Sequence, residues 1–397
     1  MQRYESYKPS GVKWLVDIPA HWEVRPGFTC FKENKDRNKG LVENTVLSLS
    51  YGRIVIKPEE KLTGLVPESF ESYQLIKPGD IVIRTTDLQN DQTSLRVGYA
   101  KDKGMITSAY LGLRCHPEIN PEYVFRLLES YDALKVFYGM GSGLRQNIDF
   151  WDFKRLPIPL PPRDEQDRIV AFLDQKTAEI NAAIAKKVRL IELLKEQIGL
   201  IQTRVISHGL NQQESQKNWR TVPLKWFIKI GSGDFLPGEK MTSEPDQLRS
   251  VPVIGGNGVM GYTAVPNTKV RVIAVGRVGA LCGNVHPIEI PAWITDNALR
   301  ITCSGEFDFS YMVAALRSLN LNRLANKNAQ PLITGSMIKD QTVSLPPFDE
   351  QVAISKFLAN AEATTNQTCQ SVEGEIKQLL ELRSIVISHA VMGMVRI

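Results

Sequence analysis

A fourteen-residue motif occurs twice in the chain and constrains the fold more than any other feature of the sequence. Residues 160–173 read LPPRDEQDRIVAFL and residues 345–358 read LPPFDEQVAISKFL, an offset of 185. A second match, Val-Ile-Ser-His at 205–208 and 386–389, has an offset of 181. The second copy is therefore four residues shorter between the matches, which removes about one turn of a 3.6-residue helix and keeps its apolar face nearly aligned. The repeat predicts a chain built from two related halves.

Each copy of the motif has the features of a helix start followed by a long helix. The paired prolines are allowed before a helix or in its first turn, but not in its interior. Asp164 and Glu165, and Asp349 and Glu350 in the second copy, place negative charge at the positive end of the helix dipole. About 44 residues of helix would measure about 66 Å at 1.5 Å per residue.

Apolar residues in both predicted helices recur at the three- and four-residue spacing of a heptad, which is the pattern of a coiled-coil seam. Lys187 interrupts the first seam, and Thr365 and Cys369 weaken the second. We predict that the helices pair as an antiparallel coiled coil; in the alternative, each helix packs only on its own domain. The predicted interhelix seam comprises Ile184, Ile191, Leu194, Ile198, Ile201 and Val205 in the first helix and Val372, Ile376, Leu379, Leu382 and Val386 in the second.

The segments before the two helices differ in sequence but share a plan. Each opens with a tryptophan in a polar setting, Trp22 or Trp219, and runs a similar distance to its double proline. Short β-like runs set off by Gly and Pro are mixed with two short helical patterns, and no regular strand–helix–strand alternation is evident. We therefore predict an α+β fold with a pseudo-twofold internal repeat, in which two mixed α/β globular domains are separated by two long helices.

The predicted boundaries follow from the repeat. The first globular domain comprises residues 1–160 and the central helical region residues 161–210. The second globular domain comprises residues 211–344 and the C-terminal helical region residues 345–397.

Motifs for catalysis or metal binding are not evident in the sequence. It has no G-x-x-x-x-G-K-[ST] phosphate loop and no H-E-x-x-H zinc motif, and its five cysteines and five histidines are scattered. No apolar run approaches the roughly 18–20 residues of a membrane span, and the polar N-terminus lacks the apolar core of a signal peptide. These features predict a cytoplasmic, non-catalytic protein that binds no metal or cofactor itself. The net charge of +5 suits a nucleic-acid partner but is too small to indicate one.

The repeated L-P-P-x-D-E-Q motif, the I-S-H helix ends and the opening segment SGVKWLVDIPAHW at 10–22 resemble the specificity subunit of type I restriction–modification systems. The resemblance covers nearly the whole chain. It implies that each globular segment is a target-recognition domain that reads one half of a bipartite, asymmetric site in double-stranded DNA. It also implies that the helical pair sets the spacer and docks two methylase (modification) subunits, that S-adenosylmethionine binds the methylase partner, and that motor–nuclease restriction subunits complete the complex.

Base-reading side chains are long and polar and lie on loops, with Arg favoured for guanine and Asn or Gln for adenine. The candidates in this chain leave a predicted strand for a polar loop, follow a Gly-Ser-Gly turn, or lie in loops rich in Gly or Asn. The alternative for each is an ordinary exposed loop residue, and the resemblance does not assign them individually. The predicted DNA-contacting residues are Arg84, Thr85, Thr86, Arg145, Gln146 and Asn147 in the first domain and Asn257, Arg277, Lys327, Asn328 and Gln330 in the second.

Two other classes of function stay open at this point. A non-reading scaffold or decoy subunit would bind methylase partners through the same frame without sequence recognition. An enzyme with an unrecognised active site would methylate or cleave DNA as the purified chain alone.

Overall fold

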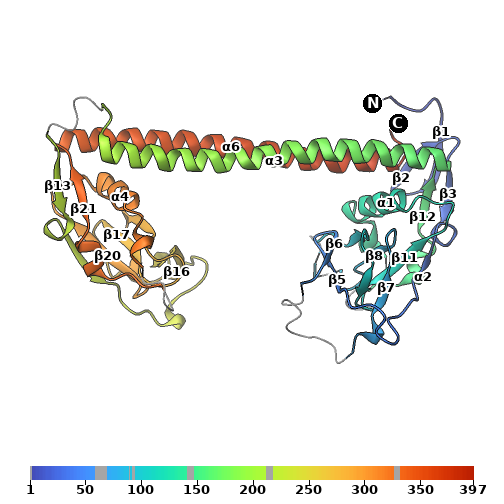
Figure 1. Cartoon of the computed structure of the whole chain (residues 1–397), viewed down its shortest axis with the longest axis horizontal. Coiled ribbons are helices and arrows are strands. Elements are labelled where there is room, and N and C mark those ends of the chain that lie inside the picture. Colours follow the sequence, from blue (N-terminus) through green and yellow to red (C-terminus); the bar gives the residue numbers. More distant parts are fainter. Residues whose placement is uncertain are drawn as a thin grey trace. The chain divides into compact units, whose positions relative to one another are not determined.

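The computed structural model describes residues 2–58, 69–88, 90–91, 94–140, 147–211, 218–325 and 331–397. The chain divides into two compact units, one of Met1–Lys187 with Gly374–Ile397 and the other of Val188–Glu373. Each unit holds one globular domain and a segment of both long helices, α3 (Arg163–His208) and α6 (Phe348–Val391) (Figure 1). The boundaries predicted from the sequence, which give each helix a region of its own, stay a prediction.

The first globular domain is built on a four-stranded antiparallel sheet in the order β4-β11-β8-β9, with the helix α1 packed against β9 and β11. A hairpin, β5–β6, and three further two-stranded pairs, β7–β10, β1–β2 and β3–β12, surround it. The elements are β1 (Tyr7–Val12), β2 (Leu15–Pro19), β3 (Glu23–Pro26), β4 (Phe31–Glu33), β5 (Leu47–Ser50), β6 (Arg53–Ile56), β7 (Gln74–Ile76), β8 (Ile81–Ile83), β9 (Val97–Tyr99), β10 (Gly104–Ile106), β11 (Leu111–Cys115), α1 (Pro121–Ala133), α2 (Phe150–Phe153) and β12 (Pro157–Leu160).

The second globular domain is built on the same plan. Its sheet has the order β14-β20-β17-β18, all antiparallel, and α4 packs against β18. The hairpin β15–β16 gains β19 as a parallel neighbour of β15, and β13 pairs with β21. The elements are β13 (Arg220–Pro223), β14 (Ile228–Ser232), β15 (Val251–Gly255), β16 (Gly258–Thr263), β17 (Val272–Gly276), β18 (Val285–Ile288), β19 (Trp293–Ile294), β20 (Ala298–Cys303), α4 (Phe309–Ser318), α5 (Gly335–Lys339) and β21 (Thr342–Leu345).

Strand register makes the two domains equivalent residue by residue. Cys115 pairs with Phe31 in the first sheet, and Cys303 pairs with Ile228 in the second. Two residues earlier on the same strands, Leu113 pairs with Ile81 and Ile301 pairs with Ile273. The predicted α+β fold with an internal repeat is therefore confirmed, and the repeat extends into globular segments whose sequences show little likeness.

The glutamine of the repeated D-E-Q motif joins each long helix to its domain. Gln166 is 2% exposed; its Oε1 accepts the Asn120 amide at 2.9 Å and its Nε2 donates to the Pro161 carbonyl at 3.0 Å. Gln351 is buried likewise; its Oε1 accepts the Asp308 amide at 2.8 Å, and its Nε2 donates to the Pro346 carbonyl at 3.0 Å. Asn120 and Asp308 are the N-caps of α1 and α4. The motif thus fixes the start of the domain helix to the start of the long helix in both halves.

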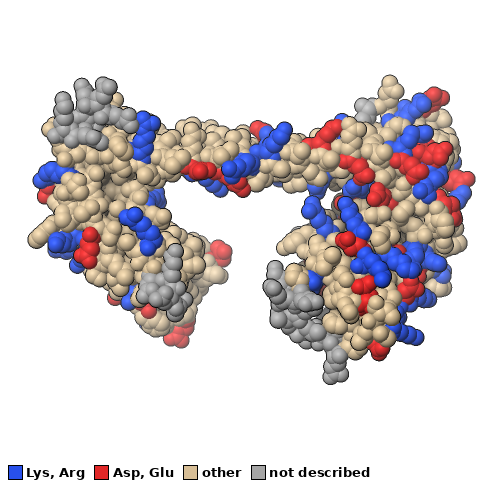
Figure 2. Space-filling view, viewed as in Figure 1, with Lys and Arg blue, Asp and Glu red and all other residues tan. Residues whose placement is uncertain are grey.

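The long helices run antiparallel within each unit. In the first unit, Arg383 donates to Asn181 Oδ1 at 2.9 Å, and Lys187 pairs with Glu375. Lys187, which interrupts the apolar seam, is therefore accommodated there by its ion pair with Glu375. Figure 2 shows charged side chains scattered among other residues along the helices. Of the predicted seam residues, Val205, Val372 and Val386 are buried, and Ile184, Ile191, Leu194, Ile198, Ile201, Ile376 and Leu379 are half-buried.

Leu382 corrects the predicted seam. Its side chain is 46% exposed, whereas the next residue, Arg383, is half-buried and bonds to the partner helix. The step from Leu379 to Arg383 is four residues and that from Arg383 to Val386 is three, as the heptad requires. A half-buried arginine can cover apolar surface with its aliphatic stem while its charged end stays at the edge, where Arg383 bonds to Asn181.

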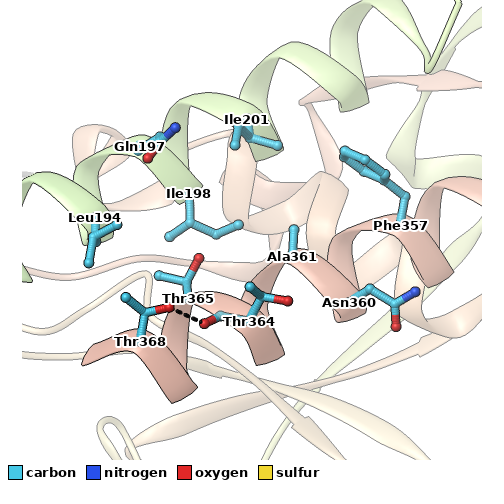
Figure 3. Close-up of a pocket in the computed structure, with 10 residues that line it drawn as sticks. All are labelled: Leu194, Gln197, Ile198, Ile201, Phe357, Asn360, Ala361, Thr364, Thr365 and Thr368. Atoms are coloured by element: carbon cyan, nitrogen blue, oxygen red, sulfur yellow. Dashed lines mark hydrogen bonds between the residues drawn. The ribbon is translucent and has the colours of Figure 1, made fainter. Parts of the chain in front are cut away.

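The weak second seam leaves a groove between α3 and α6 in the second unit, with a volume of about 390 Å³. Figure 3 shows Leu194 beside Thr368 and Ile198 facing Thr365. Thr368 donates from its hydroxyl to the Thr364 carbonyl at 2.9 Å. The short threonine side chains do not fill the space that larger apolar residues would occupy.

The Gln166 anchor gives a prediction of stability. Gln166→Ala leaves the Asn120 amide and the Pro161 carbonyl without their buried partner, so we expect a loss of about 1–3 kcal/mol in the free energy of unfolding. Urea unfolding of the full chain, followed by circular dichroism, measures it. The control is Gln175→Ala, an exposed position on the same helix, which we expect to cost less than about 0.5 kcal/mol. Equal effects of the two variants would contradict the anchoring role.

Candidate nucleic-acid interface

Equivalent loops leave the third strand of the sheet, β8 or β17, in the two domains. Strand register places Thr85 and Arg277 at the same position, two residues beyond Ile83 and Val275. The Thr85 carbonyl accepts the amide of Ile148 at 3.0 Å, and the Arg277 carbonyl accepts that of Ile333 at 2.9 Å. In both domains, the segment that precedes α2 or α5 is therefore hydrogen-bonded to the loop at the strand end. We call these two places the first and second strand-end sites.

The first strand-end site brings together two groups of predicted DNA-contacting residues. Arg84 pairs with Asp91 at 3.0 Å, and its side chain is one-third exposed. Asn147 is exposed, and its Oδ1 accepts the amide of Asp87 at 3.2 Å. Thr86 is half-buried. Hydrogen bonds of Asp87 with Asn147 and of Thr85 with Ile148 thus bring the two distant segments together.

Thr85 differs from its prediction as a base reader. It is 7% exposed, and its carbonyl is bonded within the domain. Its side chain points into the domain because it continues the alternation of the buried strand β8 by one pleat. Thr85 therefore shapes the loop rather than presenting a side chain at the surface. The predicted contacts Arg145 and Gln146 lie outside the described residues.

The second strand-end site gathers its candidates in the same way. Arg277 is half-buried, and its Nη1 donates to Ser232 Oγ at 3.4 Å. Asn257 is exposed in the turn between β15 and β16, and its Oδ1 accepts from Asn284 Nδ2 at 3.2 Å. Val278 pairs with Leu332 in an isolated β-bridge, so the segment that follows residues 327–330 lies next to the loop after β17. Lys327, Asn328 and Gln330 themselves lie outside the described residues.

Tyr51 is an exposed aromatic residue that the sequence did not single out. Ser50 pairs with Arg53, so Tyr51 and Gly52 form a two-residue hairpin turn with φ of 48° and 73°. The turn packs beside Leu95, next to the first strand-end site. Such turns favour Asn-Gly, and a bulky residue in the left-handed region is strained. The ring is nevertheless 87% exposed, so it offers an aromatic surface beside this site.

Trp151 forms a second aromatic surface that the sequence did not reveal. Its exposed ring lies beneath the Lys154 ammonium, 3.2 Å from the ring centroid, and beside the Arg155 guanidinium at 5.1 Å. The signal in the sequence is the run W-D-F-K-R on a short helix. The helix starts with a capping box at Asp149 and Asp152, directly after Ile148, whose amide donates to the Thr85 carbonyl. Paired cations over an aromatic ring suit contact with phosphate and base.

Two thiols and one histidine, Cys115, Cys303 and His21, are held within the fold. Burial raises the pKa of Cys115 to about 12 and that of Cys303 to about 11, so both are protonated at neutral pH and are poor nucleophiles. His21 bonds to Glu165 at 2.8 Å, and Tyr4 donates to the same carboxylate at 2.6 Å. Burial raises the pKa of Glu165, but these hydrogen bonds outweigh it and hold the pKa below its usual value. The cluster fixes the start of α3.

Neither a metal-binding cluster nor a membrane-spanning helix is found in the residue ranges that the structure describes. Within those ranges, no group of three or more His, Cys, Asp or Glu side chains is placed to hold a metal ion. No helix in the described part of the chain is long and apolar enough to cross a membrane.

The chain contains two copies of one α+β module. In each copy the same buried glutamine joins the module to a long helix, and each copy carries a polar strand-end site. This arrangement defines a duplicated protein with two unlike recognition surfaces. The chain belongs to the family described as the type I restriction modification DNA specificity domain, whose model matches residues 29–190 and again residues 216–378. The resemblance to type I specificity subunits seen in the sequence is therefore confirmed.

Several relatives match the chain in sequence. It is 24% identical to the type I restriction enzyme EcoprrI specificity subunit of Escherichia coli over 55% of this chain, and the match spans only 56% of that relative. It is 23% identical to the putative type I restriction enzyme MjaX specificity subunit of Methanocaldococcus jannaschii over 87% of both chains. The MjaVIII specificity subunit of the same organism is 20% identical over 90% of both chains.

Solved structures match the fold. One, from a study of complex assembly and conformational transition of the type I R-M system, has a TM-score of 0.70 at 15% identity and covers 94% of this chain and 98% of its own. The HsdS subunit of Thermoanaerobacter tengcongensis has a TM-score of 0.51 at 16% identity, covering 95% and 98%. At these identities the likeness establishes the fold.

His286 gives a prediction of pH dependence in the second domain. It lies on β18 beside the turn glycine Gly258, and burial lowers its pKa below the usual 6.5. The folded state then binds fewer protons than the unfolded state, so its stability is full above about pH 6.5 and falls as the pH drops toward the folded pKa. We expect urea unfolding to show less loss between pH 7 and pH 5 in His286→Gln than in the wild type. An unchanged pH dependence would assign the effect to other groups.

Proposed function

We propose that this chain reads DNA, with each globular domain contacting one half of a bipartite, asymmetric site through its strand-end site. The observation that carries the proposal is that two topologically equivalent sites present their arginine and asparagine side chains from different positions, since Arg84 corresponds to Gly276 and Arg277 to Thr85. Arg84 and Asn147 lie at the first, and Arg277 and Asn257 at the second. Equivalent frames with different readers suit a site whose halves differ in sequence. A scaffold that binds methylase partners without sequence recognition would not require two different polar surfaces.

The long helices, on this proposal, set the spacer between the half-sites and dock two methylase subunits. Supporting this, α3 and α6 carry a regular heptad seam whose Lys187–Glu375 and Asn181–Arg383 contacts fix the relative register of the helices. The chain itself is non-catalytic and works in the cytoplasm. S-adenosylmethionine binds the methylase partner rather than this chain, and motor–nuclease subunits join for restriction.

The reading of two half-sites is tested by variants in one domain at a time. Arg277→Ala with Asn257→Ala should relax the preference at one half-site, since each lost base contact costs about 1–3 kcal/mol. Arg84→Ala with Asn147→Ala should do the same at the other half-site. Selection from a random duplex library, using the chain co-expressed with its methylase partner, measures both preferences.

The same selection distinguishes the other functions. A wild-type chain that enriches no sequence would favour the scaffold, and methylation or cleavage by the purified chain alone would favour an enzyme. A double variant that relaxed both half-sites equally would contradict the assignment of one domain to each.

The spacer function is tested by helix length. Inserting four residues after the exposed Leu200 adds about 6 Å of helix, or roughly one to two base pairs along the duplex. A four-residue insertion is a stutter, which coiled coils accommodate by local unwinding. Methylome sequencing should show unchanged half-sites with a longer spacer, and Leu200→Ala should leave the spacer as it is. An altered half-site would refute the spacer role.

A further inference from the structure

We propose that Arg96 is a positioning residue that holds the described part of the first strand-end loop, residues 84–88 and 90–91, in the shape that reads DNA. The inference rests on the proposed DNA-reading function. Arg96 follows the loop and precedes β9, and it is 1% exposed, so its guanidinium has no access to DNA itself. Arg96 instead binds the backbone of the loop that carries Arg84.

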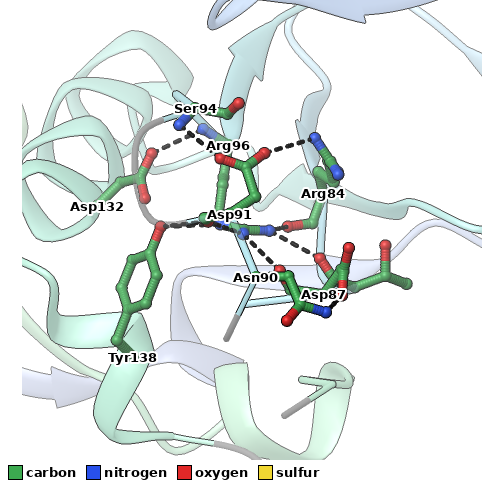
Figure 4. Close-up of polar contacts among 9 residues, drawn as sticks. Arg84, Asp87, Asn90, Asp91, Ser94, Arg96, Asp132 and Tyr138 are labelled. Atoms are coloured by element: carbon green, nitrogen blue, oxygen red, sulfur yellow. Dashed lines mark hydrogen bonds and ion pairs between the residues drawn. The ribbon is translucent and has the colours of Figure 1, made fainter. Parts of the chain in front are cut away.

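The guanidinium lies inside the turn of the loop (Figure 4). Arginine has five N–H donors in a rigid planar fork. All five are used here, and four of the bonds end on backbone carbonyls of one loop. They run to the carbonyl oxygens of Arg84 (3.3 Å), Thr86 (2.8 Å), Asp87 (3.1 Å) and Asp91, and to the hydroxyl of Tyr138 (3.1 Å).

The backbone of Arg96 is held as firmly as its side chain. Its amide donates to Asp132 Oδ2 at 2.7 Å, and its carbonyl accepts the Arg84 amide at 2.9 Å. Asp132 is itself buried on α1. Tyr138 adds a second support, because its hydroxyl donates to the Asp91 carbonyl at 3.2 Å. The loop is therefore fixed from the domain interior.

The loop that Arg96 holds has an unfavourable backbone conformation. Asp87 has a φ of 64°, in the left-handed region that costs energy for residues other than glycine. Its carbonyl is bound by Arg96, and its amide by Asn147 Oδ1 at 3.2 Å. Asn90 also donates to Asp87 Oδ1 at 2.7 Å. A turn of this kind relaxes when the groups that impose it are removed.

The equivalent position of the second domain holds a different residue, which makes a different side-chain bond. Strand register places Asn284 where the first domain has Arg96, because Val285 pairs with Val275 as Val97 pairs with Ile83. Asn284 keeps the shared backbone bond, accepting the Gly276 amide at 2.9 Å, but its side chain donates to Asn257 of the hairpin turn. Arg96 therefore supports the loop that carries Arg84, whereas Asn284 supports Asn257. A change at either position should affect only the half-site read by its own domain.

The test replaces Arg96 by lysine, which keeps the charge but offers three donors from one point and cannot span four carbonyls. Random-library selection is run with the full chain and its methylase partner. We expect discrimination at the first domain's half-site to fall about tenfold or more, the size of one mismatched base pair, with the other half-site unchanged within about twofold. Hydrogen exchange should be faster for the amides of residues 84–91 in the variant.

Two matched variants are controls. Asn284→Ala, at the equivalent position, should relax the second half-site and spare the first. Arg126→Lys, in a surface ion pair with Asp174 on the same domain as Arg96, should leave both unchanged. Thermal unfolding verifies that each protein is folded.

A folded Arg96→Lys variant with wild-type discrimination, or with both half-sites weakened equally, would overturn the proposal. If the Arg96→Lys variant does not fold, the Tyr138→Phe variant tests the proposal instead. It removes one hydroxyl at the edge of the cluster and should weaken the first half-site alone by about twofold to fivefold, on the scale of one lost hydrogen bond, and an unchanged preference would overturn the proposal. A wild-type chain that selects no sequence would instead refute the proposed function, and this inference with it.

Discussion

The buried amide of the repeated glutamine is the interaction on which the two halves of this molecule depend. In each half it binds the first turn of the domain helix and the backbone before the long helix at once. A buried amide without partners is costly, so the domain and the helix must meet in one orientation. The rest of each domain is free to change, provided that this contact is kept. That freedom explains why the motif recurs almost unchanged while the sequences it anchors have diverged.

The elements with a strong local period could be predicted from the sequence. Both long helices, their acidic first turns and most of the seam follow from the spacing of apolar residues and from the paired prolines. Leu382 was misplaced because residue class alone favours leucine over Arg383, although only the latter keeps the heptad step. The sheets could not be predicted, since β4 pairs with β11 across some eighty residues and no local pattern encodes that pairing.

The sequence placed the candidate residues on loops, which stays a prediction of where DNA is contacted, and it did not reveal the residues that support those loops. Polar loop residues after a buried strand marked residues 84–86, and hydrogen bonds of Thr85 with Ile148 and of Asp87 with Asn147 join this loop to the segment at 147–148. Thr85 turned inward because the strand alternation continues past the last paired residue. Arg96 carried no signal, since its partners are backbone carbonyls and a carbonyl has no identity in a sequence. Tyr51 was hidden for the opposite reason: its turn departs from the residue types that such turns favour.

The comparison of Arg96 with Asn284 suggests how one frame supports different readings. The backbone bond from the strand end is the same in both domains, whereas the side chain at that position organises a loop in one and a hairpin turn in the other. A base contact requires placement to within a few tenths of an ångström, so the support beneath a reader constrains its specificity as much as the reader itself. Changing a buried support alters the geometry of several exposed residues together. We infer that differences in recognition between the two domains lie partly in residues that never reach the DNA.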